Sequence, residues 1–509
     1  MHTRQVRPKL PKRRPIKPGI PACYLLQTEK SEVDGNSAVR RWTFGERDKS
    51  RTTKTILMIG ETGTGKTTLI NTMVNFMLGV GWEDIVWFQI MEEDKKKSQA
   101  ESQTSAITVY ELFLETSSSC LRIIDTPGYG DTSSKEFDEH IAANLEVLFS
   151  SEDGIHEIDV VGLVVKSTQN RLTEFQSYIL NAILSVFGKD IKNNIAVFIT
   201  HSDGLPAANV ITSLKEAGVP CAKDTGGEPL HFMFNNRQTD SREENFKSAW
   251  DLGQNSMKSF LSFLQDIDVK QLRMTQGVLR ERKRLEACVY NLQDAIKMEE
   301  LKQKEVQQTQ SALEENRKKL EKNEDFTYEI EKAYKAKVPI QPSWWKISKE
   351  ATCCTICEEN CHYPGCWLVK DLSWCSVMKD NRCTVCTGKC PVSAHVKENM
   401  IYVPKTQKVT GTSETLKRQC QDLEKYKEDL QKQLNESIVK KADLLEQAYQ
   451  CIVNLEEIAL KGGSTIIHLD FLIEKMKETG DNDKVQKLEE LNKDIQPSKK
   501  KRLARWAVL

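Results

Sequence analysis

The stretch Gly60-Glu61-Thr62-Gly63-Thr64-Gly65-Lys66-Thr67 matches the pattern G-x-x-x-x-G-K-[ST], and Thr68 follows it. An apolar run at 55–59 precedes the stretch and an amphipathic pattern at 66–78 follows it, which predicts a turn between a strand and a helix. In such a turn, glycines let successive backbone N–H groups point at phosphate oxygens, and the helix N-terminus adds a favourable dipole. We therefore expect 60–68 to line a polyphosphate site, with Lys66 at the β- and γ-phosphates and the Thr67 hydroxyl on Mg²⁺.

A second motif, Asp125-Thr126-Pro127-Gly128, follows the apolar run 121–124. A carboxylate at the end of a buried strand is placed to contact the Mg²⁺ shell, so Asp125 is a metal candidate and the Gly128 N–H can sense the γ-phosphate. An ordinary Pro-Gly turn is the alternative, but the order of the two motifs favours a nucleotide site. A first switch loop should supply a hydroxyl ligand from Thr104, with Ser105 and Thr108 as competitors.

Apolar strands alternate with amphipathic helices from about residue 40 to residue 265. This alternation predicts an α/β domain with a mostly parallel sheet and helices on both faces. The expected strands are 55–59, 107–114, 121–124, 159–165, 195–199 and 230–234, and the expected helices are 66–78, 136–148, 172–187, 208–217 and 245–265.

Two loops near the ends of later strands carry candidates for recognising a base. Guanine presents N1–H and N2–H donors, so a carboxylate can pair with both, and Asp203 follows the strand 195–199 with His201 just before it. Asn235 or Asn236 would contact the base from the loop after 230–234. Helix capping or turn formation is the alternative role for these side chains.

Taken together, these motifs resemble those of the septin, GIMAP (AIG-type) and chloroplast-import Toc group of GTPases. The septin-like motif is Asp125-Thr-Pro-Gly-Tyr-Gly-Asp131. The GIMAP-like segments are Asn170-Arg171-Leu172-Thr173, Thr200-His201-Ser202-Asp203 and Phe234-Asn235-Asn236-Arg237. The resemblance covers about 40–265, roughly half of the chain. It implies a P-loop G domain, guanine specificity and switch loops that rearrange on hydrolysis. His201 stands where the usual Asn/Thr-Lys-x-Asp motif has lysine, a departure that the GIMAP-like and Toc-like proteins share.

The catalytic residues cannot be named from the sequence. Ras-like enzymes orient water with a glutamine just after the Asp-x-x-Gly motif, and this chain has Tyr129 there. The resemblance implies slow GTP hydrolysis, or hydrolysis stimulated by dimerisation across the G-domain face. A switch that only binds nucleotide is the alternative.

Composition narrows the class of protein. The chain has 509 residues, which allows two to four domains of ~150 residues, and its 73 Lys+Arg balance its 73 Asp+Glu, so overall charge does not point to nucleic acid. The longest apolar run, about 160–165, is far below the ~18 residues of a membrane span. The basic N-terminus has no apolar core after it, as a signal peptide would. We expect a cytoplasmic protein, with the nucleus as the alternative.

Beyond the G domain, which we place at 39–267, the chain changes character. Residues 1–38 are expected to be a disordered basic arm, because four prolines and seven Lys/Arg occupy the first 20 positions. A long helix or coiled coil is predicted at 268–338, where Val306, Leu313 and Leu320 are seven apart, and a second at 412–495. These could form an antiparallel hairpin or pair with a second chain. The basic tail 496–509, like the arm, could bind anionic membrane or nucleic acid or remain solvated.

Nine of the fifteen cysteines lie between Cys353 and Cys390. The series Cys354-x₂-Cys357-x₃-Cys361-x₄-Cys366 repeats 29 residues later as Cys383-x₂-Cys386-x₃-Cys390-x₄-His395. Such density favours thiolate metal ligands over disulfides, and eight ligands suit two structural Zn²⁺ ions within 352–398. The ligands could be sequential or interleaved between the ions, and Cys353, His362 and Cys375 could replace a member.

The function predicted from these features is a guanine-nucleotide switch. GTP/GDP and Mg²⁺ would bind the G domain, which would be coupled to a zinc-stapled helical stalk that engages a protein partner, in a homodimer or oligomer formed through the G domain or the coiled coil. One alternative is a septin-like assembly protein with a structural nucleotide. Another is a zinc-dependent nucleic-acid-binding protein with a regulatory G domain.

Overall fold

The computed structural model describes most of the chain, and its contacts divide it into two compact units. Unit 1 is Met1–Leu279 with Ile458–Gly463, and unit 2 is Arg280–Glu457 with Ser464–Leu509. The described residues are 12–33, 36–48, 50–90, 106–114, 120–128, 141, 144–149, 151, 153–168, 180, 184–237, 243–322, 324–340, 350–363, 371–375, 377–415, 423–460 and 466–493.

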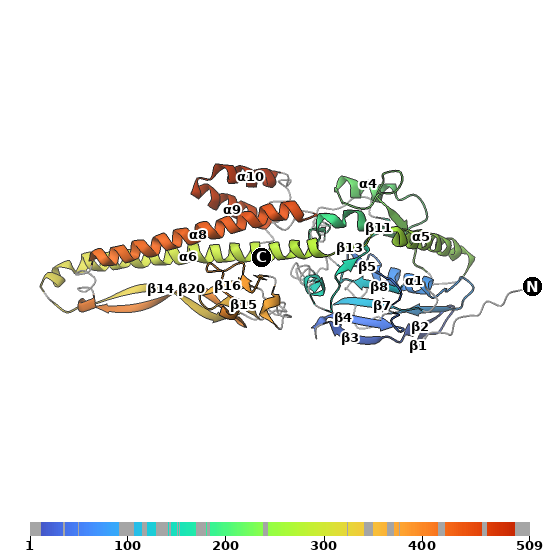
Figure 1. Ribbon diagram of the computed structural model, residues 1–509, viewed down its shortest axis with the longest axis horizontal. Coiled ribbons are helices and arrows are strands. Elements are labelled where there is room, and N and C mark those ends of the chain that lie inside the picture. Colours follow the sequence, from blue (N-terminus) through green and yellow to red (C-terminus); the bar gives the residue numbers. More distant parts are fainter. Residues whose placement is uncertain are drawn as a thin grey trace, which may run out of the picture. The chain divides into compact units, whose positions relative to one another are not determined.

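An eight-stranded sheet forms the centre of unit 1 (Figure 1). Its strands are β3 (Glu29–Val33), β4 (Asn36–Phe44), β5 (Thr53–Gly60), β7 (Ile107–Leu112), β8 (Cys120–Asp125), β10 (Val160–Lys166), β11 (Ile195–Thr200) and β12 (His231–Met233). Their order is β12-β11-β10-β5-β8-β7-β4-β3. Neighbours are parallel except for β7 with β8 and β3 with β4, so the predicted mostly parallel sheet is confirmed.

Alternate residues of β5 enter two different apolar cores, one on each face of the sheet. Ile56 and Met58 pack in one core, and Leu57 and Ile59 pack in the other, all fully buried. A strand covered on both faces is a continuous apolar run, which is how this segment reads in the sequence. Strand β5 therefore lies in the interior of the sheet, and the P-loop begins at its C-terminal end.

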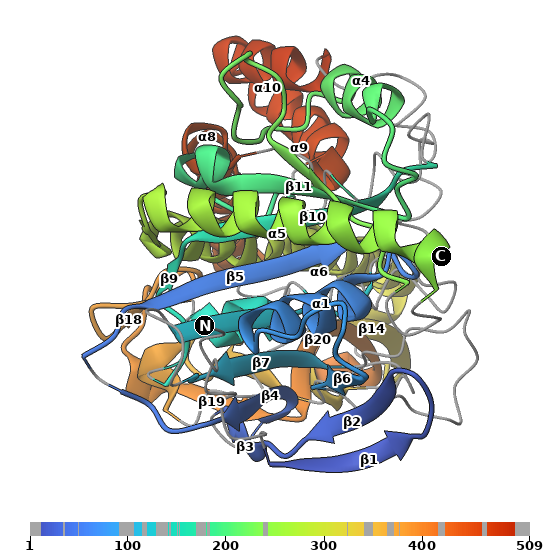
Figure 2. The same cartoon turned by 90° about the vertical axis from the view of Figure 1, so that its right-hand side faces the viewer.

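Helices cover both faces of this sheet, as predicted. Side chains of α1 (Lys66–Met77) and α5 (Lys247–Asp266) contribute to the core that holds Met58, and the two helices lie on one face of the sheet (Figure 2). Side chains of α4 (Ala208–Glu216) contribute to the opposite core. The predicted helices 136–148 and 172–187 lie largely outside the described residues. The short elements of unit 1 are β9 (Glu157–Ile158), which pairs with β13 (Lys270–Gln271), and the 3₁₀ turns η1 (Lys189–Asn194) and η2 (Glu244–Phe246).

The predicted disordered arm is wrong from residue 13 onward; residues 1–11 lie outside the described part of the chain. Strands β1 (Arg13–Lys17) and β2 (Ala22–Leu26) form a three-stranded sheet with β6 (Val86–Gln89), and β3 and the start of β4 lie in the central sheet. Cys23 and Leu26 are buried in the core beside α1, which anchors the segment. The prolines do forbid a helix, but a sheet edge tolerates them, and the β1–β2 register shifts between Pro15 and Lys17.

Unit 2 contains long helices and a long β-ribbon. The helices are α6 (Arg273–Glu321), within which the unit boundary falls, α8 (Leu423–Ile458), α9 (Ile466–Thr479) and α10 (Asn482–Lys493). Glu281 bonds Asn454 and Glu299 pairs with Lys441, so residue numbers rise along α6 as they fall along α8. The two helices are therefore antiparallel within one chain (Figure 1). Among the described helices, none is both long and apolar enough to cross a bilayer.

The first predicted helix is wrong at its C-terminal end. Helix α6 stops at Glu321, and β14 (Thr327–Pro339) pairs along all thirteen residues with β20 (Met400–Thr412) in antiparallel register. The strand alternates: Tyr328 is buried against Ala312 of α6, and its neighbours Thr327 and Glu329 are exposed. Lys and Glu are common in both exposed helices and exposed ribbons, so composition did not separate the two.

The cysteine-rich segment forms a small module between the two ribbon strands. Its sheet has the order β16-β15-β19. The elements are β15 (Ala351–Cys354), β16 (Glu359–His362), η3 (Leu372–Trp374), β17 (Met378–Lys379), β18 (Arg382–Cys383), η4 (Val392–Ala394) and β19 (His395–Glu398).

Candidate functional site

The P-loop joins β5 to α1 as the sequence predicts. Gly63 and Gly65 have φ angles of 76° and 84°, in the left-handed region that favours glycine. A Cβ atom on Gly60 would lie 2.4 Å from the carbonyl oxygen of Val164 on β10, so the backbone there passes too close for any side chain. The three glycines are therefore required by the backbone path, which closes a turn at the N-terminus of α1.

Lys66 points into this turn. Its Nζ donates hydrogen bonds to the carbonyl oxygens of Gly60 at 2.9 Å and Glu61 at 3.1 Å, and only 7% of the residue is exposed. Burial lowers the pKa of the Lys66 ammonium to about 8, a shift that the nearby carboxylates of Asp125 and Glu61 partly offset. A phosphate anion would replace neutral carbonyls as partners of this ammonium and would favour its charged form.

Asp125 and Gly128 lie beside the P-loop. Asp125 ends β8 directly opposite Met58 of the neighbouring β5 and is fully buried. A Cβ on Gly128 would approach the backbone of Thr62 to 2.5 Å, so this glycine and the P-loop are in close contact. The structure thus brings the two sequence motifs together at one edge of the sheet, with Thr67 and Thr68 at the start of α1 and Thr67 half-buried.

Strand β11, next to β10 in the sheet, is hydrogen-bonded to the P-loop at its C-terminal end. The Thr200 hydroxyl at the end of β11 donates to the carbonyl oxygen of Thr64 at 2.6 Å, and His201 follows in a left-handed conformation with φ of 56°. The imidazole Cε1 lies 3.7 Å from the position that a Cβ of Gly65 would occupy. Burial and the neighbouring Lys166 lower the pKa of His201, so the ring is neutral at pH 7.

Asp203 and Asn235 lie on two adjoining loops. Asp203 is exposed, and its Oδ1 accepts a hydrogen bond from the Leu205 N–H at 3.0 Å. The Ser202 N–H donates to the carbonyl oxygen of Phe234 at 3.0 Å, which holds the loop after β11 against the loop after β12. Asn236 accepts a hydrogen bond from the Thr72 hydroxyl of α1 at 3.1 Å, so it fixes the loop, and Asn235 is the candidate of the pair for a base.

Lys166 and Thr200 also lie beside the P-loop, although their residue types alone predict no role for them there. Lys166 ends β10 with its Nζ 3.7 Å from where a Cβ of Gly63 would lie, so it is a second cation beside the P-loop. Thr200 joins the loops as described above. Both residues could be predicted from one rule, that parallel strands end at the same edge of a sheet. For Lys166, the signal in the sequence is its position directly after the apolar run 159–165. Thr104 and Tyr129 lie outside the described residues.

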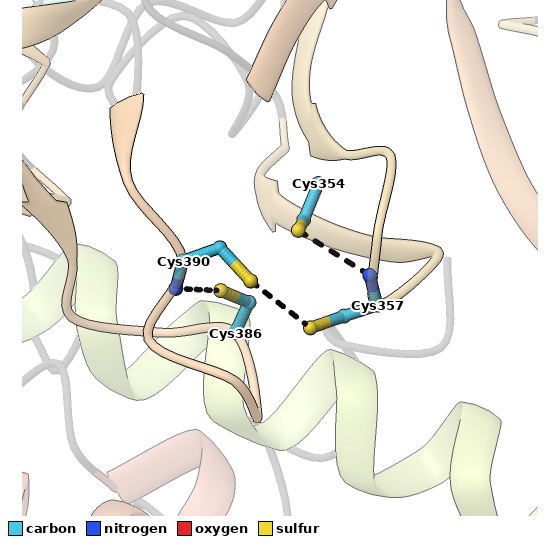
Figure 3. A group of neighbouring side chains, drawn as sticks. All are labelled: Cys354, Cys357, Cys386 and Cys390. Carbon is cyan, nitrogen blue, oxygen red and sulfur yellow. Dashed lines mark hydrogen bonds between the residues drawn. The ribbon is translucent and has the colours of Figure 1, made fainter. Parts of the chain in front are cut away.

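The cysteine-rich module gathers its ligand candidates into two groups. In the first, the sulfurs of Cys354, Cys357, Cys386 and Cys390 all lie within 4.8 Å of one another, and the four side chains gather at one place in the module (Figure 3). Cys357 and Cys390 are 3.7 Å apart. Zn–S bonds of ~2.3 Å in a tetrahedron would separate the sulfurs by about 3.8 Å, so this spacing fits zinc.

The second group consists of Cys361, Cys383, Cys386 and His395, all buried. The Nδ1 of His395 lies 2.9 Å from the carbonyl oxygen of Pro391, which fixes a proton on Nδ1. Its buried Nε2 finds no hydrogen-bond partner among the described residues. With Nδ1 bonded to Pro391, the ring has its Nε2 left as the donor atom for a metal beside three thiols, a donor set suited to Zn²⁺, so the residues fit this ion.

Backbone amides further favour thiolates in both groups. N–H groups of Cys357, Val385, Cys386, Gly388 and Cys390 donate to cysteine sulfurs at 3.3–3.4 Å. The two groups of candidate ligands are interleaved along the chain, one of the two arrangements that the spacing allowed. Cys366 lies outside the described residues. Cys353 and Cys375 belong to neither group, nor does His362, whose Nδ1 is 3.2 Å from the Cys375 sulfur.

Comparison with known proteins concerns the first half of the chain. Residues 54–249 match the sequence model of the AIG1 family. Immune-associated nucleotide-binding protein 4 of Arabidopsis thaliana is 26% identical over 197 residues, which is 37% of this chain and about half (52%) of that relative. Crystal structures of Toc33 from Arabidopsis thaliana, with GDP and Mg²⁺ or with Mg²⁺ and GMPPNP, are each 17% identical. They cover 44% and 43% of this chain and 89% and 87% of theirs, with TM-scores of 0.31 and 0.29. The predicted AIG-type resemblance is therefore confirmed, and residues 54–249 are a G domain of the AIG1 family.

Proposed function

We propose that this protein binds GTP and GDP with Mg²⁺ at the edge of the sheet in unit 1. The observation that carries the proposal is the junction of the left-handed P-loop, the buried Lys66 and the buried Asp125 at the N-terminus of α1. Thr67 and Asp125 would hold Mg²⁺, which neutralises charge on the β- and γ-phosphates when bound. The relative from Arabidopsis is itself named a nucleotide-binding protein.

Guanine selectivity rests on Asp203. Its exposed carboxylate can accept hydrogen bonds from guanine N1–H and N2–H in addition to the bond from the Leu205 N–H, because each oxygen has two lone pairs. Xanthine carries a carbonyl oxygen where guanine carries its N2 amine. An amide at position 203 would donate to that oxygen.

Asp203→Asn is expected to weaken GDP binding by about 3 kcal/mol, roughly 150-fold in Kd, and to create a preference for XDP. Competition of GDP and XDP for a fluorescent nucleotide measures both effects. Asp251→Asn, an exposed aspartate on α5, is the matched control and should leave GDP binding unchanged. Unaltered guanine preference in Asp203→Asn would remove Asp203 from the site.

Nucleotide affinity should depend on pH through Lys66. The phosphates bind the protonated form, and burial holds the pKa of free Lys66 at about 8. Affinity for GDP is therefore expected to fall about tenfold between pH 7 and pH 9. Calorimetry across this range tests the prediction with Lys66→Ala as control, since the variant should lose this pH dependence. An equal fall in both proteins would assign the titration to another group.

The G domain is proposed to hydrolyse GTP slowly, or faster when two G domains pair. Tyr129 stands at the position of the water-orienting glutamine of Ras-like enzymes, so that glutamine is not available to speed hydrolysis. Turnover per molecule that rises with protein concentration would support stimulation by dimerisation. Turnover independent of concentration would support a slow monomeric switch.

Unit 2 is proposed to hold two Zn²⁺ ions and to present the helical stalk to a protein partner. The donor sets described above carry the zinc proposal, and the antiparallel α6 and α8 supply the stalk. We place the protein in the cytoplasm, because the thirteen described cysteines form no disulfide and thiolate zinc sites require reduced cysteines. Native mass spectrometry of the full chain would report bound nucleotide, zinc count and subunit number together.

A further inference from the structure

We propose that Cys386 bridges the two metal ions, so that seven residues rather than eight complete both tetrahedral sites. The inference rests on the zinc binding proposed above and adds the connection between the sites. Cys386 is the residue common to both groups: its sulfur lies within 4.8 Å of Cys354, Cys357 and Cys390 on one side and of Cys361, Cys383 and His395 on the other.

Each ion lacks one ligand without this shared atom. Cys354, Cys357 and Cys390 supply three donors to one centre, and Cys361, Cys383 and His395 supply three to the other. Structural zinc sites are almost always four-coordinate. A thiolate sulfur has enough lone pairs to bind two ions and also to accept a hydrogen bond, here from the Cys390 N–H at 3.3 Å.

The other described cysteines of the module are engaged elsewhere. The Cys353 thiol donates toward Asn360 Oδ1 at 3.3 Å and the Met400 carbonyl oxygen at 3.5 Å, on the side of β15 that faces the ribbon. Cys375 contacts the His362 ring at 3.2 Å. Neither sulfur belongs to a group with the six cysteines that surround the two centres.

The path of the chain explains why Cys386 reaches both centres. Cys383, the last residue of β18, faces one centre and Cys390, in the loop that follows, faces the other, so the residue midway between them passes between the centres. Glu359, buried on β16, accepts hydrogen bonds from the Thr387 N–H at 2.8 Å and its hydroxyl at 2.6 Å. Lys389 Nζ donates to the carbonyl oxygen of Thr384 at 3.0 Å, which closes the loop on itself. The position of Cys386 is thus held from both sides.

The shared ligand also sets the charge balance. The two ions would be held by six thiolates and by the neutral imidazole of His395, and every proton displaced from these groups would pass to solvent. Two divalent ions with six thiolates give the cluster a net charge of −2. Were a seventh cysteine to complete a separate eighth position, the net charge would be −3.

The decisive experiment is ¹¹³Cd NMR on the full chain after its zinc is replaced by cadmium. We expect two cadmium ions per chain and two resonances, each split by the other, because a single bridging sulfur transmits scalar coupling between the ions. Two resonances without mutual splitting would overturn the bridge and leave the two zinc sites standing. Failure to bind cadmium or zinc would overturn the bridge together with the proposed zinc sites.

Variants separate the bridge from an eighth ligand. Cys366→Ser and Cys375→Ser are expected to keep two ions and the splitting. Loss of an ion in Cys366→Ser would identify Cys366 as a ligand and overturn the shared position. Cys386→Ser should disturb both resonances at once, whereas Cys354→Ser should remove only one ion. Should Cys386→Ser fail to fold, the splitting between the two resonances of the unaltered chain still decides the question.

Discussion

Replacing Lys66 by alanine is expected to weaken binding of both GDP and GTP by about 3 kcal/mol, roughly 150-fold in Kd. The ammonium is buried, and it already lies within the turn of backbone that would surround the phosphates, at 2.9 Å from the Gly60 carbonyl oxygen. Loss of this cation removes charge-assisted hydrogen bonds that the buried surroundings make stronger than they would be in water. Isothermal titration calorimetry with Mg²⁺ on nucleotide-free protein measures the change.

Lys215→Ala is the matched control for this variant. Lys215 lies on α4 of the same unit and pairs with Glu228 at the surface, where an ion pair contributes little. Its removal should leave nucleotide affinity unchanged. An affinity of Lys66→Ala within a factor of two of the unaltered protein would show that the P-loop does not hold the phosphates, and the proposed function would fall with it.

Removal of zinc is expected to unfold the cysteine-rich module while the G domain stays folded. Structural zinc supplies about 10–16 kcal/mol of apparent folding free energy per ion in small peptides, far more than the few apolar side chains of this module can replace. Its buried core consists largely of the cysteines themselves, with Val377, Met378 and Val385 among the few apolar additions. Without metal, the buried thiols and the His395 Nε2 would lose their partners.

Hydrogen–deuterium exchange with mass spectrometry can follow this change by region. After treatment with a strong zinc chelator, peptides from 351–398 should exchange rapidly, and peptides from β5 and β11 should keep their protection. Cys383→Ser should reproduce the loss without chelator, and Cys221→Ser, a buried cysteine of unit 1, should not. Retained protection of 351–398 in metal-free protein would mean that side-chain packing alone folds the module.

The nucleotide site was predictable from the sequence because its chemistry is local. The glycines, Lys66 and Thr67 lie within eight consecutive residues, and their backbone path depends on φ angles that glycine alone adopts without strain. Asp125 could be predicted as part of the nucleotide site, because a carboxylate at the end of a buried strand lies at the same edge of the sheet as the P-loop. Lys166 obeys the same rule, but a single lysine after a strand carries no spacing pattern to distinguish it.

Segments that depend on distant partners were predicted less well. The strand β1 holds Pro15 and several basic residues, and it forms because β2 pairs with it and buries Cys23 and Leu26. Likewise, β14 forms because β20 offers a partner along its whole length. A chain rich in Lys and Glu accepts either helix or exposed strand, and only the partner decides between them.

In the cysteine-rich module, the kind of site was predictable from the sequence, but the grouping of its residues was not. The sequence by itself determined that the protein has a phosphate-binding turn and a repeated set of zinc-type ligands, because residue type and short spacing carry that chemistry. Only the tertiary structure decided which cysteines share a centre and that Cys386 lies in both groups. Ligand grouping depends on where β15, β16 and the loop after β18 meet in space, and those contacts join residues too far apart for any spacing rule to specify.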